Sequence, residues 1–167
     1  MAGEEMYIAL KILAIFLTAI IMGLALAHAL ELPGKLRLGK EQYLAVQSIY
    51  YPGFTIAGEV SEVGGILVVL ALMVITPRNA AQFLPIAGAL AALVVMQVIF
   101  WLMTQPVNKI WLERIELAHS AQRFFSSGDV GTKADWTVLR KQWEYSHIMR
   151  AVAAMLGLFL LTLALAL

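Results

Sequence analysis

The stretch WEYSHIMRAVAAMLGLFLLTLALAL, residues 143 to 167, joins a polar beginning to an apolar run that continues to the last residue. No charged side chain follows Arg150. An α-helix needs roughly 20 mostly apolar residues to cross the hydrocarbon core of a bilayer, and residues 148–167 meet that need. The stretch therefore predicts a transmembrane helix with charged groups at its mouth.

The rest of the chain repeats this apolar pattern. Of its 167 residues 61% are hydrophobic and 14% charged, and the mean hydropathy is +0.81, which is too apolar for a soluble domain of this length. Three more apolar runs lie between polar or proline-containing breaks, at about 7–30, 55–75 and 83–103. Four spans in a single domain, residues 1–167, predict an all-α integral membrane four-helix bundle. Glu4 and Glu5 oppose a cleaved signal peptide, because such a peptide begins with positive charge.

One long polar stretch, residues 105–147, separates the third and fourth spans. Its first part has the pattern of an amphipathic helix at the cytoplasmic interface. Asp135 is expected to cap the last helix, which would then begin near residue 135, before it enters the membrane. This stretch and the loop 31–54 hold nine lysines and arginines, against two on the opposite side. The imbalance predicts a cell (inner) membrane protein with both loops in the cytoplasm and both termini outside.

Charge and cysteine content exclude several classes of function. The net charge is +1 and no block of basic residues occurs, so nucleic acid is not an expected partner. There are no cysteines, so thiolate metal sites and cysteine nucleophiles are excluded.

Polar side chains recur at the cytoplasmic ends of the four spans, and six of them form i, i+3 pairs that share a helix face. The pairs supply two imidazoles and four carboxylates, the ligand set of a carboxylate-bridged iron or manganese site or, with fewer ligands, a zinc site. Glu59 and Glu62 weigh most, since an ionised side chain inside a span costs roughly 2.5 to 3.5 kcal/mol at its centre. The predicted metal ligands are His28, Glu31, Glu59, Glu62, Glu144 and His147. The residues expected to orient these ligands or to bind a small molecule are Asn108, Arg140 and Arg150.

The same residues allow a structural interpretation. Lys35, Arg37, Arg140 and Arg150 are enough cations to pair with the carboxylates without any metal. The cluster would then be an ion-pair network in a non-catalytic membrane protein that works through partner proteins.

Two further alternatives concern haem and transport. His28 and His147 lie at similar depth on different helices, which is the minimum for bis-histidine ligation of haem, although the flanking carboxylates favour a hard metal ion. Transport has weaker support, because the sequence shows no broken helix.

Four phrases occur in order along the chain: HALELPGKLRL (28–38), VQSIYYPGF (46–54), PVNKIWL (106–112) and DWTVLRKQWEYSHIMRA (135–151). With them the chain resembles the bacterial branch of domain-of-unknown-function family 1772, four-span membrane proteins grouped with fungal anthrone oxygenases. The resemblance implies a four-helix architecture and, through the fungal members, oxidation of a lipophilic polycyclic aromatic by molecular oxygen. The shared pattern is matched here by Asn108, Asp135, Trp136, Trp143, His147 and Arg150. No catalytic residue is transferred by it.

Together these observations predict a polar cluster at the cytoplasmic mouth of the bundle that binds or oxidises a hydrophobic small molecule entering from the membrane. The expected partners are the lipid bilayer and that ligand, and a homo-oligomer is compatible with the pattern.

Overall fold

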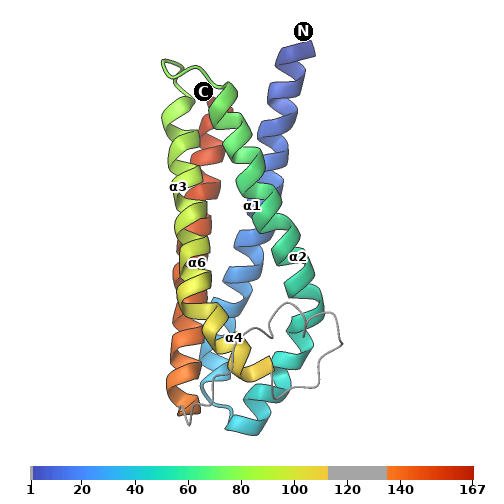
Figure 1. The fold of residues 1–167 in the computed structure, drawn as a ribbon, viewed down its shortest axis with the longest axis vertical. Coiled ribbons are helices and arrows are strands. Elements are labelled where there is room, and N and C mark those ends of the chain that lie inside the picture. Colours follow the sequence, from blue (N-terminus) through green and yellow to red (C-terminus); the bar gives the residue numbers. More distant parts are fainter. Residues whose placement is uncertain (1, 113–134) are drawn as a thin grey trace.

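The computed structural model describes residues 2–112 and 135–167, which are helical apart from short turns and contain no strand. The elements are α1 (Ala2–Lys35), α2 (Lys40–Ile75), α3 (Phe83–Ile99), the π-helical turn η1 (Phe100–Thr104), α4 (Gln105–Leu112) and α6 (Trp136–Ala166) (Figure 1). Four segments are long and apolar enough to cross a membrane: Gly3–Lys35, Gly53–Ile75, Phe83–Trp111 and Trp136–Ala166. The predicted all-α four-helix membrane bundle is confirmed.

The helices extend beyond the predicted spans. α1 continues past Pro33 to Lys35, and α2 begins at Lys40, well before its span. The early part of α2 is polar, yet Tyr43 and Gln47, one helical turn apart, are both fully buried. Packing of this face on the bundle stabilises a helix that the apolar pattern alone does not predict.

The third span was expected to end near residue 103, before Pro106, but the helix continues through η1 into α4. Proline lacks an N–H and its ring clashes with the carbonyl one turn earlier, so a regular α-helix cannot pass through it unchanged. In η1 the helix widens, and the Gln105 N–H bonds to the Phe100 carbonyl five residues back. Gln142 Nε2 from α6 donates to the Met103 carbonyl at 3.0 Å. The π turn therefore accommodates Pro106 without ending the helix.

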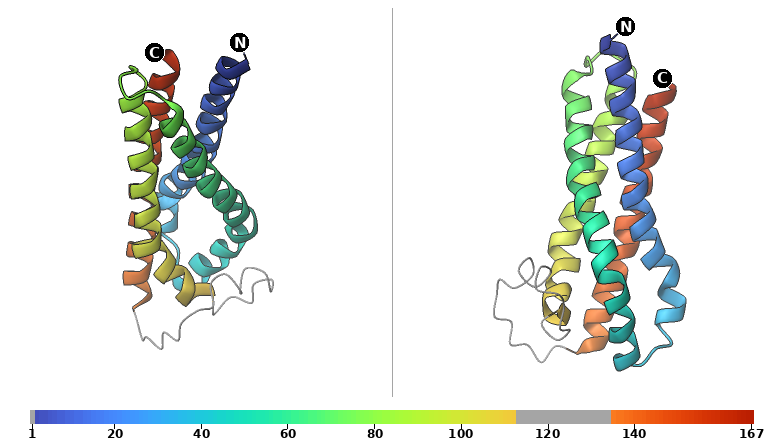
Figure 2. Two further views of the ribbon diagram at one scale, coloured as in Figure 1. Left: turned by 45° about the horizontal axis from the view of Figure 1, so that its top comes forward. Right: turned by 90° about the vertical axis from the view of Figure 1, so that its right-hand side faces the viewer.

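The four long helices form a ring in the order α1, α6, α3, α2, and α2 and α3 share the smallest of the four interfaces. Both termini lie at one end, and α2 diverges from α3 toward the other end, where α4 lies (Figures 1 and 2). One apolar cluster fills the terminal half, with Ala14, Ile21, Val69, Leu72, Ile86, Leu93 and Leu161 among its buried members. A second cluster fills the opposite end, with Tyr43, Val107, Trp111, Leu139 and Trp143.

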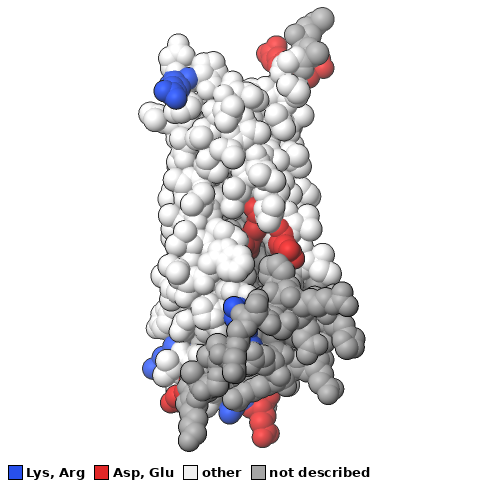
Figure 3. Space-filling view, in the orientation of Figure 1, with Lys and Arg blue, Asp and Glu red and all other residues white. Residues whose placement is uncertain are grey.

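The distribution of charge suits a bilayer. Charged side chains gather at the two ends, and the face between them is uncharged apart from an acidic patch at mid-height (Figure 3). Glu59 and Glu62 are the acidic residues in that part of α2.

The start of the last helix follows the prediction. Asp135 precedes α6, and its carboxylate accepts a hydrogen bond from the Thr137 N–H at 2.9 Å, which lowers the pKa of Asp135. Most of the expected amphipathic helix falls within residues 113–134, which lie outside the described residues. Its first part is α4, which buries Val107 and Trp111.

Candidate functional site

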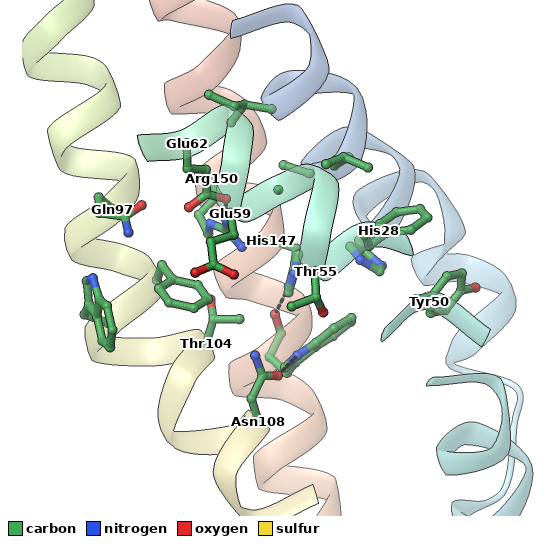
Figure 4. A pocket seen from close by; sticks show the side chains of 18 of the residues that line it. His28, Tyr50, Thr55, Glu59, Glu62, Gln97, Thr104, Asn108, His147 and Arg150 are labelled. Atoms are coloured by element: carbon green, nitrogen blue, oxygen red, sulfur yellow. Dashed lines mark hydrogen bonds and ion pairs between the residues drawn. The ribbon is translucent and has the colours of Figure 1, made fainter. Parts of the chain in front are cut away.

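A cavity of about 310 Å³ lies inside the bundle between the two apolar clusters (Figure 4). All four long helices, η1 and α4 contribute to its wall. Most of the wall is apolar, and five aromatic side chains line it: Tyr50, Phe54, Phe100, Trp101 and Trp143. A mostly apolar cavity of this size with a few convergent polar groups is typical of small-molecule sites.

The cavity opens sideways between α2 and α3. Glu59 and Val63 of α2 and Trp101 of η1 line the cavity and also reach the outer surface, with Val63 54% and Trp101 51% exposed. All three lie within segments that could span a membrane. Acidic atoms are visible on this lateral face (Figure 3). The opening therefore faces the depth at which lipid surrounds the protein.

Two histidines meet at the inner wall of the cavity. His28 of α1 and His147 of α6 are both buried, and their rings lie edge to face with centroids 4.5 Å apart. The His28 Nδ1 lies 3.2 Å from the Lys35 ammonium, which can only donate, so His28 carries its proton on Nε2. The His147 Nδ1 lies 2.9 Å from the Trp143 carbonyl, which can only accept, so His147 carries its proton on Nδ1. In the neutral forms, which burial favours, His28 is then a donor at Nε2 and His147 an acceptor at Nε2.

A buried ion pair lies beside the histidines. The Arg150 guanidinium donates to Glu62 Oε1, and both side chains are almost fully buried. The Gln97 amide satisfies both its neighbours when its nitrogen faces Glu62 Oε2 at 2.7 Å and its oxygen faces Trp101 Nε1 at 3.3 Å. Arg150 also lies over the Phe100 ring, 5.1 Å from its centroid. This chain of contacts fixes the polar groups on the α3 side.

Lys35, the last residue of α1, lies at the polar end of the site. Its ammonium is 3.0 Å from the Glu31 carboxylate and 3.9 Å from Glu144, and it lies 4.9 Å from the ring centroids of Tyr50 and Trp143. Burial, followed by the Glu31 carboxylate, raises the pKa of Tyr50 to about 12. Tyr50 is therefore a neutral hydroxyl at physiological pH.

Some of the predicted site residues line the cavity, and others lie outside it. The cavity brings together His28, Glu59, Glu62, Asn108, His147 and Arg150. Glu144 instead accepts a hydrogen bond of 2.6 Å from the Tyr43 hydroxyl. Arg140 donates to the Leu38 carbonyl at 3.4 Å and stacks 4.6 Å from the Trp136 ring centroid. Asn108 Oδ1 accepts from Trp143 Nε1 at 2.9 Å.

The six predicted metal ligands do not form one group. Within residues 2–112 and 135–167, no three histidine, aspartate or glutamate side chains are placed to hold a metal ion. Glu62 faces Arg150, Glu31 faces Lys35, and Glu144 faces Tyr43. The side chains therefore do not fit the dimetal site expected from the i, i+3 pairs.

The two histidines do not fit a haem either. Bis-histidine ligation places the porphyrin between two imidazoles, on opposite sides of the iron. The rings of His28 and His147 are in direct edge contact, 4.5 Å between centroids, and leave no space for the macrocycle.

Several contributors to the site were not predicted, and Gln47 is the most informative of them. It lines the cavity with no exposed surface, and neither its amide nitrogen nor its amide oxygen has a hydrogen-bond partner among the described residues. Gln97 could have been noticed as a lone amide inside an apolar run, whereas Gln47 lies in a polar stretch that does not predict burial. A buried amide without partners indicates a place where a bound molecule supplies them.

No protein-family model, curated protein or solved structure matches this chain. The resemblance to the anthrone-oxygenase-like family stays a prediction, and the function is argued from the site itself.

Proposed function

We propose that the protein is a multi-pass membrane protein that binds a lipophilic small molecule in the cavity, with entry from the bilayer between α2 and α3. The cavity itself carries this proposal, because it combines aromatic walls, a lateral opening and the unpartnered amide of Gln47. Burial of an apolar ligand against these walls would stabilise the complex by roughly 25 cal/mol per Å² of apolar surface removed from water. The polar groups would fix its orientation.

His147 is the side chain of the cavity best suited to take part in a chemical reaction. Among the described residues no hydrogen bond is formed to its Nε2, and the bond from Nδ1 to the Trp143 carbonyl holds the ring in place. An oriented neutral imidazole in an apolar cavity is suited to accept a proton from a bound hydroxyl or activated C–H group. Removal of such a proton is a step that oxidation of a lipophilic aromatic by oxygen, as the resemblance implies, would need.

The binding proposal is tested with a neutral fluorescent probe, 9-anthracenemethanol, added to protein in detergent micelles. Trp101 and Trp143 line the cavity, so energy transfer from tryptophan to anthracene reports occupancy. Thr55→Phe fills the cavity, whereas Ile56→Phe adds the same ring on a side chain that is 66% exposed.

Saturable transfer in the wild type and in Ile56→Phe, lost in Thr55→Phe, is the expected result. Equal saturable binding by both variants would show that the probe occupies another place, and the proposal would be abandoned.

A second candidate function is favoured by the ion pairs. Glu62–Arg150 and Glu31–Lys35 neutralise charges inside the bundle and would fix helix register in a non-catalytic protein that acts through partners.

The excess of lysine and arginine near the α1–α2 turn and α4 supports the inference that this end faces the cytoplasm.

A further inference from the structure

We propose that the ligand of this cavity is a lipophilic cation, with a protonated amine attached to an apolar or aromatic body, and that Glu59 is its counterion. This inference rests on the proposed binding function and names the class of molecule that the cavity would take.

The balance of charge in the cavity favours a cation. The wall holds two carboxylates, Glu59 and Glu62, against one guanidinium, Arg150, while burial of both histidines favours their neutral forms. Arg150 pairs with Glu62, and no lysine or arginine of the described ranges lies within ion-pair distance of Glu59. Among the described residues, Glu59 therefore stands at the lateral opening without a counterion, at a depth where an unpaired charge is unfavourable. A cationic ligand would remove that penalty.

The position of Glu59 suits this role. Figure 4 shows its carboxylate directed from α2 into the space lined by Thr104 and His147. Its side chain also belongs to the exposed rim. A cation that arrives from the membrane would meet this carboxylate at the entrance.

The aromatic walls are suited to a cation as well as to an apolar body. Ammonium and guanidinium groups bind over aromatic faces, and aromatic cages recognise organic ammonium ligands. Rings of this cavity already contact the protein's own cations: Lys35 lies over Tyr50 and Trp143, and Arg150 lies over Phe100. Phe54 and Trp101 line the same cavity, with Trp101 at the rim beside α2. Phe54 and Trp101 would offer their aromatic faces to the cationic group of a ligand in the same way.

The neutral polar groups complete the argument. An ammonium group has donors only, so it needs acceptors. The cavity offers His147 Nε2 and the Gln47 amide oxygen, and the latter is fully buried without a partner in the described part of the chain. Gln47 is an observation independent of the carboxylates: its amide oxygen would accept a hydrogen bond from the ammonium group, and its amide nitrogen would donate to an acceptor on the body of the ligand.

A matched pair of probes tests the inference. 9-(Aminomethyl)anthracene is protonated at neutral pH, and 9-anthracenemethanol has the same ring system without the charge. Dissociation constants for both are measured by energy transfer on wild type, Glu59→Gln and Glu5→Gln. The Glu5→Gln control removes one exposed carboxylate at the far end of α1 and so changes the net charge equally.

The ammonium probe is expected to bind about tenfold more tightly than the alcohol to wild type and to Glu5→Gln, and about equally with the alcohol to Glu59→Gln. Equal binding of both probes by the wild type, or a preference that survives in Glu59→Gln, would overturn the cation inference while leaving the cavity as a binding site. Failure of both probes to bind saturably would overturn the proposed function and this inference with it.

Discussion

The ion pair between Glu62 and Arg150 can be broken from either side, and the two single variants and their combination form a double-mutant cycle. The Glu62 and Arg150 side chains are nearly buried, at 11% and 8% exposed, so solvent does little to screen a charge left alone. Removal of one partner of a buried pair costs about 3 to 5 kcal/mol, mostly because the other charge loses its counterion. Gln97 still donates to Glu62, which places Arg150→Met near the lower end, about 3 kcal/mol.

Glu62→Gln keeps an acceptor for the guanidinium and is expected to cost about 2 kcal/mol. The double variant leaves no unpaired charge, so its loss should be smaller than the sum of the single losses by about 2 kcal/mol or more. The free energy of unfolding is measured by far-ultraviolet circular dichroism as dodecyl sulfate is added to dodecylmaltoside micelles. Arg37→Met serves as the control, because Arg37 is exposed, and is expected to change stability by less than about 0.5 kcal/mol.

Two results would refute this account of the pair. Arg150→Met as stable as Arg37→Met would mean that the contact contributes nothing. A more stable Glu62→Gln would mean that repulsion between Glu59 and Glu62 outweighs the pairing with Arg150, as in a site that needs a bound cation to be stable.

Three further predictions concern the amide, the tyrosine and the metal hypothesis. Gln47→Leu removes two buried polar atoms that lack partners, so it should raise the free energy of unfolding by about 1 to 2 kcal/mol while weakening binding of the ammonium probe; a destabilised variant that binds normally would contradict the role given to the amide. Since the pKa of Tyr50 is raised from 10.0 to about 12, the folded state retains its proton longer than the unfolded chain, and stability should fall between pH 10 and 12 more steeply in wild type than in Tyr50→Phe, as measured by denaturation at each pH. Equal slopes would show that Tyr50 is not protected in the fold. Metal analysis by mass spectrometry should give the same low iron, manganese and zinc content for wild type and Glu62→Gln, because no described group of ligands gathers there; stoichiometric metal lost in the variant would restore the dimetal hypothesis.

The sequence predicts the fold well because the bilayer restricts what an apolar run can do. Each run of about 20 apolar residues must become a helix, and the cap at Asp135 follows from local chemistry. The start of α2 was not predictable in this way, because it depends on the packing of Tyr43 and Gln47. The continuation of the helix through Pro106 was not predictable either, because it depends on the π turn.

The site was less predictable, because an i, i+3 pair fixes only the relative direction of two side chains on one helix. Glu144 and His147 differ by about 60° around α6, and in a closely packed bundle that angle decides which neighbour each side chain meets. Glu144 meets Tyr43 of α2, whereas His147 meets the cavity and His28. Rotation of each helix about its axis comes from the whole interface, so the sequence could name the polar residues without showing which of them face one another.

The lateral opening between α2 and α3 also changes what affinity the site would need. A molecule that enters from lipid is present at its concentration in the bilayer, which for a hydrophobic compound far exceeds its concentration in water. An enrichment of about a thousandfold is equivalent to about 4 kcal/mol, so even contacts of millimolar strength would fill about half of the cavities at micromolar aqueous levels. Selection among membrane-soluble molecules would then depend less on the apolar walls, which all such molecules satisfy, than on the few polar atoms at the rim and on the inner wall.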